Sequence, residues 1–489
     1  MMYKPRRMHP AVIIFKVIHL FSYREVIIPI IVSFISFSKD YFLYVFSGIA
    51  LLLVIFTAFS IISWLRFTYV VTEDELQIEW GIFVRKKRYI SKGRIQSIDL
   101  TVNVLHRIFK LARVQIETAG SGKEAEASLT AVKLTEAERL HKELKGYSKT
   151  AALRKQDVEA QVPFHQISNK RLFIAGTTSG SIGFLLAIIA FFFSEVEQFI
   201  PKHVYDDMLN WIISLSVFLL IIIISSILLI LWLLGIAGTM IKFWNFRIER
   251  HENELFITRG LFEKKQTTIP LKRIQAIGME ESIFRQPFGY ATIFAEVAGN
   301  VEDSGGAFVL YPLLKKKEVE ELLSSLLPAY TLPKGQIQTL PNRALKYYLL
   351  RACVPMVLIS IAILIFLPTF SWTALILLAV GIWFGYLRYR DAGFLLEKER
   401  IILTYRKWYK QTLIIFHKRI QTMGKQQHII HRKQHLANIE ASILGNYSLG
   451  SHYKIKDLEE RDVDRIASWY SYRKRSSSKN VTKKYDCDV

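Results

Sequence analysis

The sequence is poor in cysteine and in acidic residues. Its 489 residues include two cysteines, too few for a disulfide framework. Cys353 lies in an apolar run and Cys487 in a charged tail, so we expect them not to pair. Asp and Glu number 42 against 65 Lys and Arg, which gives a formal net charge of +23. Such a balance is typical of nucleic-acid binders and of membrane proteins with basic cytoplasmic segments.

Sequence signatures of catalysis, metal binding and nucleic-acid binding are also missing. There is no nucleophile elbow, phosphate-binding loop, paired-carboxylate motif or Cys/His pairing. His428, His431 and His435 in "HIIHRKQH" lack flanking carboxylates or cysteines that would complete a metal shell. We interpret that run as a solvated basic face. The basic and aromatic "YRKWYK" comes without any nucleic-acid-binding motif. We therefore expect no enzyme, no metal, no cofactor and no nucleic-acid partner.

Long apolar runs are abundant, and hydrophobic residues make up 51% of the chain. A helix needs ~20 mostly apolar residues to span a bilayer. Six runs approach this length, and they occur in three closely spaced pairs, which predicts three membrane hairpins. The first run is short, contains Pro29 and extends back toward Ile18. The runs are Val26–Phe37, Tyr41–Trp64, Leu172–Phe193, Trp211–Met240, Tyr347–Leu367 and Trp372–Tyr386.

The distribution of Lys and Arg predicts the orientation of these hairpins. The segments that join the paired runs are poor in both residues, and the middle one is acidic. Basic stretches such as "KPRR", "VRKKR" and "YRKR" all fall on the other side of the runs. By the positive-inside rule, we expect a multi-pass protein of the cell (inner, cytoplasmic) membrane with both termini and all soluble stretches in the cytoplasm.

The apolar runs carry few ionisable residues. Transporters and proton relays place such residues near the bilayer centre, whereas Arg351 lies only about one turn into the fifth run. The small-residue pattern "GTTSG" (Gly176–Gly180) predicts close helix packing. The runs therefore favour an anchored protein. A lipid transporter or lipid-binding regulator, using a cavity between the helices and the soluble domains, stays as the alternative.

The soluble stretches repeat one another. The tripeptide Arg-Ile-Gln occurs three times, beginning at Arg94, Arg273 and Arg419. Relative to that arginine, an alanine recurs eighteen residues later and a basic residue twelve residues later. These are Ala112, Ala291 and Ala437, and His106, Arg285 and His431. Each copy has short β-branched and aromatic runs between turns and closes with an amphipathic run. The pattern predicts a thrice-used antiparallel sheet capped by one helix.

The second copy carries a family resemblance. "KRIQAIGMEESIFRQPFGYATIFAEVAG" (Lys272–Gly299) and its two weaker copies, each after paired apolar runs, resemble the bacterial pleckstrin-homology-like (PH-like) membrane proteins. The three-domain, YdbT-like members are the most similar, over nearly the whole chain. The resemblance implies a smaller two-span partner with one such domain, and a link to envelope stress and antimicrobial-peptide tolerance. The third copy has Gln434-His435 where the second has Phe288-Gly289, which implies that a shared pocket would be altered there.

The predicted fold is an α+β membrane protein. Six transmembrane helices form three hairpins, and each hairpin precedes a cytoplasmic PH-like antiparallel β-sheet domain capped by a C-terminal helix. The predicted parts are the N-terminus and first hairpin (1–65), PH-like domain 1 (66–148), a linker (149–170), the second hairpin (171–241), PH-like domain 2 (242–329), a linker (330–345), the third hairpin (346–387), PH-like domain 3 (388–471) and a basic, polar tail (472–489).

The predicted function is that of a non-enzymatic membrane scaffold or interaction module in envelope defence, acting with the smaller partner and the lipid bilayer. Cations near an anionic leaflet gain ~1 kcal/mol each, and guanidinium groups suit phosphates. The positive-inside bias alone would also place cations there. The candidate contacts for anionic headgroups or a partner are Arg94, Gln96, Arg273, Gln275, Arg419, Gln421, Arg85, Lys86, Lys87, Arg88, Lys264 and Lys265.

Overall fold

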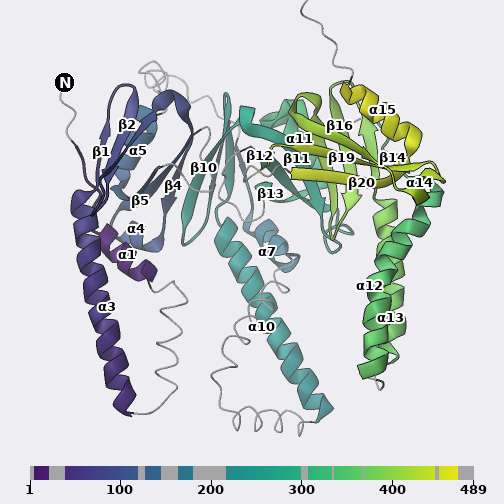
Figure 1. Ribbon diagram of the computed structural model, residues 1–489, viewed down its shortest axis with the longest axis horizontal. Coiled ribbons are helices and arrows are strands. Elements are labelled where there is room, and N and C mark those ends of the chain that lie inside the picture. Colours follow the sequence, from purple (N-terminus) through teal and green to yellow (C-terminus); the bar gives the residue numbers. More distant parts are fainter. Residues whose placement is uncertain are drawn as a thin grey trace, which may run out of the picture. The chain divides into compact units, whose positions relative to one another are not determined.

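The computed structural model is built from three similar repeats (Figure 1). It describes residues 5–20, 39–118, 127–144, 164–179, 216–298, 307–332, 335–366, 368, 371–445 and 451–471. The chain divides into two compact units, Met1–Leu271 and Lys272–Val489. The boundary lies within the range 242–329 predicted as PH-like domain 2, and each unit is described by itself below.

The first unit contains a complete β-domain. Leu76 and Ile90 from its first three strands pack with Ile98 and Val114 from the next three. The closing helix buries the face that the sequence predicts, made of Ala137, Leu140 and Leu144. The elements are β1 (Thr68–Val71), β2 (Glu75–Trp80), β3 (Lys86–Ser91), β4 (Ile95–Val102), α4 (Val104–Ile108), β5 (Leu111–Thr118), β6 (Ala127–Lys133) and α5 (Leu134–Leu144).

The residues of the second repeat fall in both units. Its first three strands belong to the first unit: β8 (Arg247–His251), β9 (Glu254–Arg259) and β10 (Lys264–Pro270). Its next three strands and closing helix belong to the second: β11 (Ile274–Glu281), β12 (Tyr290–Val297), β13 (Ala307–Lys315) and α11 (Lys316–Leu326). The helix α11 buries Val319, Leu322, Leu323 and Leu326, as its sequence pattern predicts.

The third repeat lies wholly in the second unit. Its core joins Ile401 and Leu413 with Ile439, Ile455 and Ile466, the last from the closing helix. The elements are β15 (Gly393–Leu396), β16 (Arg400–Arg406), β17 (Lys410–Phe416), β18 (Ile420–Gln426), α14 (Ile429–Arg432), β19 (Leu436–Ile443), β20 (Ser451–Glu459) and α15 (Glu460–Ser471). We call β3, β10 and β17 the third strands of their repeats, and β4, β11 and β18 the fourth strands.

Two seven-stranded sheets run across the repeats. Their orders are β6-β5-β4-β10-β9-β8-β7 and β13-β12-β11-β17-β16-β15-β14. In each, the fourth strand of one repeat pairs antiparallel with the third strand of the next. Leu100 in the first core lies opposite Gln266, whereas the buried Ile269 points to the other face beside Leu255. Side chains alternate along a strand, so one face of this sheet packs in the first repeat and the other face packs in the second.

The segments before the second and third helix pairs each add a strand to their repeats. β7 (Phe164–Gln166) pairs with β8, and β14 (Gln338–Thr339) pairs with β15. In the first repeat, Arg6 forms a bridge to Tyr69 of β1. The sequence treats the segments of β7 and β14 as linkers. The structure places them in the repeat because their main chains pair with the first strand.

Three of the helices in the described residues are long and apolar enough to cross a membrane, over Phe46–Arg66, Phe218–Phe243 and Asn342–Phe366. They belong to α3 (Lys39–Arg66), α10 (Val217–Phe243) and α12 (Leu345–Phe366), which match the second, fourth and fifth apolar runs. The sixth run forms α13 (Thr373–Arg390), which lies beside α12 (Figure 1). At Gly385 of α13, the position of a Cβ atom would lie 3.1 Å from the Cα of Leu349, so the two helices approach closely.

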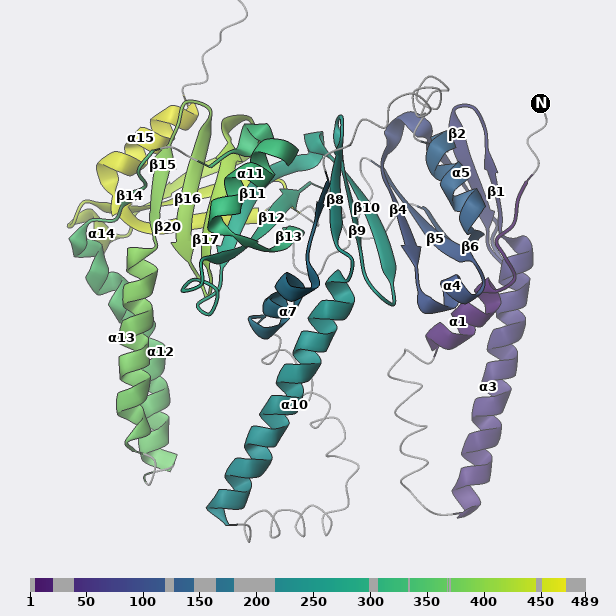
Figure 2. The ribbon, with the colours of Figure 1, turned by 180° about the vertical axis from the view of Figure 1, so that it is seen from behind.

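The first and third apolar runs fall largely outside the described residues. The helix α1 (Val12–Leu20) precedes the first run and packs Val12 and Phe15 against Leu111 and Ala131 of the first domain. The helix α7 (Asn169–Thr177) packs on α10, as Figure 2 shows. A Cβ atom at Gly176 would lie 3.0 Å from the Cα of Ile236, the close approach that "GTTSG" predicts.

Candidate functional site

The Arg-Ile-Gln motif forms the same corner in all three repeats. A one-turn 3-10 helix ends at Arg94, Arg273 and Arg419, and the fourth strand begins at the next residue. In each repeat the pairing register shifts between the isoleucine and the residue after the glutamine, which leaves the glutamine as the bulged residue. The motif therefore directs the chain from the third strand into the fourth.

Burial of the motif side chains differs among the repeats. Arg273 is buried and its Nε donates to the Ala298 carbonyl at 2.7 Å, while the buried Gln275 donates from Nε2 to the Arg273 carbonyl at 3.0 Å. Both side chains therefore have little surface to offer a headgroup. Arg94 and Gln421 are exposed, and Arg419 is half-buried. The side chain of Gln96 lies outside the described residues.

The tyrosine beside Arg419 shows how closed its corner is. Burial raises the pKa of Tyr330 to about 12, although the Arg419 guanidinium lowers it in part. The ring of Tyr330 stands edge-on to Phe416, with centroids 4.9 Å apart. The guanidinium of Arg419 therefore lies beside the packed ring of Tyr330, in a corner that is largely closed to solvent.

The hairpins between second and third strands form a recurring surface feature, which we call the hairpin tips (residues 81–85, 260–264 and 406–410). Each tip carries a large exposed aromatic side chain eleven residues before its motif arginine. Phe83 is 87% exposed, Phe262 54% and Trp408 70%. Gly81 and Gly260 have φ angles of 118° and 105°, so the first two tips turn through a conformation that favours glycine. The aromatic position was missed by the sequence analysis, though the repeat alignment contains it.

Each tip is held against a long helix. The ring of Phe83 lies 6.4 Å from that of Phe59 in α3, and the ring of Trp408 lies 5.5 Å from that of Phe384 in α13. In the second repeat, the amide of Leu261 donates to the Ile241 carbonyl of α10 at 2.9 Å. Phe59 lies within an apolar segment long enough to cross a membrane.

A guanidinium group fixes the main chain at every tip. Arg66 at the end of α3 donates from Nη1 to the Ile82 carbonyl at 3.0 Å. Arg388 in the last turn of α13 donates from Nη2 to the Lys407 carbonyl at 3.1 Å. Arg107 of α4 does the same for the Leu261 carbonyl at 3.0 Å. The accepting carbonyl is twelve residues before the motif arginine each time, so the three tips are built alike.

Six of the predicted cations lie at or directly beside the first two tips. Arg85, Lys86, Lys87 and Arg88 are exposed at the start of β3, and Lys264 is exposed while Lys265 is half-buried at the start of β10. Lys87 pairs with Glu79 at 2.7 Å, and the Arg88 guanidinium lies 5.3 Å from the centre of the Trp80 ring. Exposed aromatic rings flanked by Lys and Arg are the composition of a membrane interface.

One cation of the third tip has a different role. Arg406 is fully buried, and its Nε lies 2.5 Å from Oδ2 of Asp391. Its Nη2 donates to Oε1 of Gln286 in the second repeat at 2.6 Å. Lys410 also reaches Asp391, at 3.3 Å. The hydrogen bond from Arg406 to Gln286 therefore joins the second and third repeats, and the ion pair with Asp391 holds the guanidinium in place. Composition alone does not separate this role from that of the neighbouring exposed cations.

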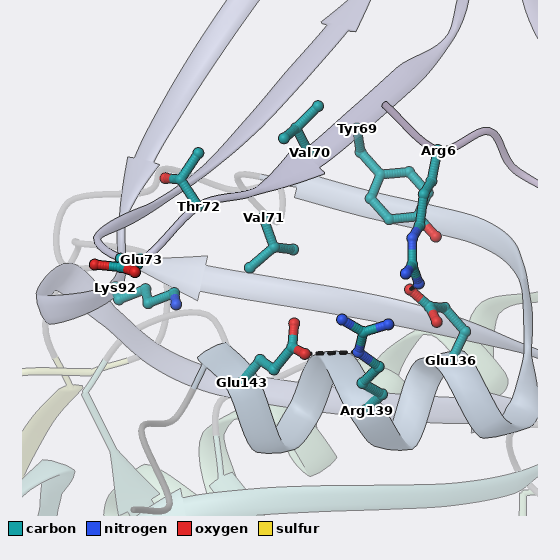
Figure 3. A pocket seen from close by; sticks show the side chains of 10 residues that line it. All are labelled: Arg6, Tyr69, Val70, Val71, Thr72, Glu73, Lys92, Glu136, Arg139 and Glu143. Carbon is teal, nitrogen blue, oxygen red and sulfur yellow. Dashed lines mark hydrogen bonds and ion pairs between the residues drawn. The ribbon is translucent and has the colours of Figure 1, made fainter. Parts of the chain in front are cut away.

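A cavity of about 250 Å³ opens between β1 and α5 in the first domain (Figure 3). Arg6 pairs with Glu136, and Arg139 pairs with Glu143 at 2.6 Å. Glu73 and Lys92 lie at the other end of the cavity, and the remaining lining residues are Tyr69, Val70, Val71 and Thr72. Three cations and three carboxylates balance in charge, and burial raises the pKa of Tyr69 to about 12. The cavity is polar and neutral, unlike the basic tips.

The run "HIIHRKQH", which the sequence predicts to be a solvated basic face, is exposed at His428 and His435 but buried at His431. His431 and its counterpart His106 are buried, and His106 Nε2 lies 2.8 Å from the Thr130 carbonyl. His435 has a φ of 52°, matching Lys110 and Gly289 at the equivalent turn. Within the described ranges, no group of three or more His, Cys, Asp or Glu residues could hold a metal ion. The recurring turn explains the position of His435, whereas His431 lies in α14.

Comparison with known proteins agrees with this architecture. The family model described as "Bacterial PH domain" matches residues 26–148, 187–330 and 358–474. The chain is 34% identical over 495 residues to the UPF0699 transmembrane protein YdbT of Bacillus subtilis (strain 168), an alignment that covers 97% of this chain and 99% of that protein. With its long apolar helices and three β-sheet repeats, the chain belongs to the bacterial PH domain family as a YdbT-like transmembrane member.

Proposed function

We propose that this protein is a non-enzymatic scaffold of the cell membrane that holds its PH-like domains against the cytoplasmic leaflet. The observation that carries the proposal is the threefold hairpin tip, with an exposed aromatic ring, neighbouring cations and a fixed contact to a long apolar helix. Aromatic rings favour the headgroup level, and cations favour anionic lipids. The tips would set the height and orientation of each domain at the membrane.

The membrane arrangement we propose has six spans in three hairpins, with both termini in the cytoplasm. Four of the six predicted runs coincide with helices in the described residues. The basic tips at the ends of α3, α10 and α13 support a cytoplasmic position by the positive-inside rule. A topology reporter joined after Phe37 is expected outside the cell, and a cytoplasmic signal there would contradict this orientation.

The tip proposal is tested by measuring depth in the bilayer. Phe83→Cys would carry a spin label in full-length protein whose native cysteines are replaced (Cys353→Ser and Cys487→Ser). Asp74→Cys, in the turn at the other end of β2, is the matched control. We expect the label at position 83 to collide with membrane-soluble oxygen and to be shielded from a water-soluble relaxant, with the reverse at position 74. Equal accessibility at both positions would show that the tips do not reach the membrane.

The physiological role we propose is envelope defence against membrane-active peptides, together with a smaller two-span protein that has one PH-like domain. A deletion strain is expected to become more sensitive to such peptides. The triple variant Phe83→Asp, Phe262→Asp and Trp408→Asp should fail to restore tolerance, whereas Asp74→Asn should restore it. Unchanged sensitivity in the deletion strain would overturn the defence role. Purification in mild detergent, followed by identification of bound proteins and lipids, tests the partner.

A further inference from the structure

The two junctions between repeats share one register. At the first, Lys264 of β10 pairs with Val102 of β4. At the second, Lys410 of β17 pairs with Glu281 of β11. Each lysine stands nine residues before its own motif arginine, and each partner stands eight residues after its own. Such agreement over two separate pairings shows that a fourth strand in this protein is built to accept a third strand at a fixed offset.

One fourth strand has no such neighbour. β18 pairs with β19 and is the terminal strand of the sheet β18-β19-β20 formed by the described residues. Two residues in the middle of this strand, Thr422 and Gly424, are exposed to solvent. Nothing lies within 4 Å of the position of a Cβ atom on Gly424. The carbonyl of Gln421, near the start of β18, accepts from the Tyr470 hydroxyl at 2.9 Å, and the rest of the strand forms the edge of the sheet. Such an edge strand is a template for a further strand.

The polar character of this edge does not argue against docking. At the first junction, the equivalent positions of β4 are Ser97 and Asp99, and both are buried. There the amide of Thr268 in the third strand donates to Oδ1 of Asp99 at 3.3 Å. A fourth strand with polar side chains is therefore covered by a following domain elsewhere in this same chain.

The third strand of the first repeat, β3, is poorly suited to pair with this edge. β3 is also terminal in its sheet, but it carries Lys87 and Arg88 where β10 has Gln266 and Thr267. Lys and Arg on an edge strand are a common device against edge-to-edge pairing. In the shared register, Lys87 of a second copy would face Lys425 of β18, and directly opposed like charges destabilise a sheet. Whereas β3 carries two cations at these positions, β18 carries only Lys425, whose charge is paired with Asp464 at 2.6 Å.

We propose that the free edge of β18 binds the third strand of a PH-like domain from a different polypeptide, in the register of the two internal junctions. The fitting partner has uncharged residues at the two positions where β3 has Lys87 and Arg88. This inference rests on the proposed scaffold function and names its docking surface. It makes the third repeat the acceptor end of a chain of paired domains.

The experiment supplies a suitable donor strand from the protein itself. In full-length protein in lipid nanodiscs, Lys87→Gln and Arg88→Thr give β3 the residues of β10. Lys142→Gln and Lys317→Gln, at exposed positions on α5 and α11, remove the same charge elsewhere and serve as the control. We expect the wild type and the control to remain at the mass of one chain, 56.7 kDa, and the β3 variant to form multiples of it.

Register is read by cross-linking. The shared offset places position 89 opposite position 423, so Tyr89→Cys and Met423→Cys, in the background lacking native cysteines, should form disulfides between chains only in the β3 variant. Adding Gly424→Lys to β18 should abolish both the multiples and the cross-link. A β3 variant that stays at one chain, or assemblies that survive Gly424→Lys, would overturn the proposal. Cross-linking in the wild type would make a second copy the partner and overturn the assignment to a different polypeptide.

These outcomes are separate from those that test the scaffold function. Depth of the hairpin tips and tolerance to peptides can fail while β18 still accepts a strand. Conversely, loss of strand pairing at β18 leaves the tip measurements unchanged.

Discussion

Arg351 of α12 forms a two-pronged ion pair with Asp457 of β20, with nitrogen–oxygen distances of 2.6 and 3.0 Å. Asp457 is fully buried and has a φ of 60°, and the Nε2 of His431 lies 3.4 Å from the same carboxylate. The sequence shows Arg351 only as a charge near the end of an apolar run. In the structure it fixes the helix α12 to the third PH-like domain.

Removing this arginine should weaken that attachment. Arg351→Met leaves the buried Asp457 carboxylate without its main counter-charge, and we expect a loss of roughly 3–5 kcal/mol in the free energy of unfolding of this part. Arg343→Met, which breaks a half-exposed pair with Glu459 of the same strand, should cost at most about 1 kcal/mol. Chemical denaturation in detergent measures both. Adding Asp457→Asn should recover much of the loss, and no recovery would contradict this account.

Gly278 and Gly424 occupy equivalent positions with different surroundings. The position of a Cβ atom on Gly278 overlaps the Phe294 ring at 2.1 Å, whereas Gly424 has nothing within 4 Å. Gly278→Val should therefore displace Phe294 and destabilise the junction of β11 and β17 by at least about 1–3 kcal/mol. Gly424→Val should be nearly neutral, because valine suits an open strand position. Comparable midpoints of unfolding for the two variants would argue against this packing.

Glu296 should make stability depend on pH. Burial raises its pKa above the ordinary value of 4.5, although hydroxyl groups of Tyr453 and Ser451 donate to its carboxylate. Its contribution to stability is therefore complete below the ordinary pKa and is lost as the pH rises through the folded-state pKa. Glu296→Gln removes this loss, so the variant should exceed the wild type in stability near neutral pH and converge with it below the ordinary pKa. The exposed Glu320→Gln should change stability little at any pH in the same denaturation series.

The motif arginines should differ in their effect on stability. Arg273→Ala removes a buried charged donor from the half-buried Ala298 carbonyl, and we expect a loss of about 1–3 kcal/mol. Arg94 holds the same corner in the first repeat but is exposed, so Arg94→Ala should change stability by about 0.5 kcal/mol or less. Hydrogen exchange at the amides of β11 and β4 reports on each corner separately. Equal effects would mean that burial does not determine the role of the motif.

The sequence by itself determined the repeats, the long apolar helices and the closing helices, because these follow from local periodicity and from spacing along the chain. The spacing around Arg94, Arg273 and Arg419 is enough to superimpose three copies, and the apolar faces of α5 and α11 are visible as patterns of three and four residues. Only the tertiary structure decided how the copies are joined. The pairing of β4 with β10 and of β11 with β17 connects residues more than a hundred positions apart, and no local pattern encodes such a contact. For the same reason, Arg406 and Arg273 are buried while Arg88 and Arg94 are exposed. The burial of a guanidinium depends on the residues that the fold brings to it, such as Gln286 and Asp391 at Arg406.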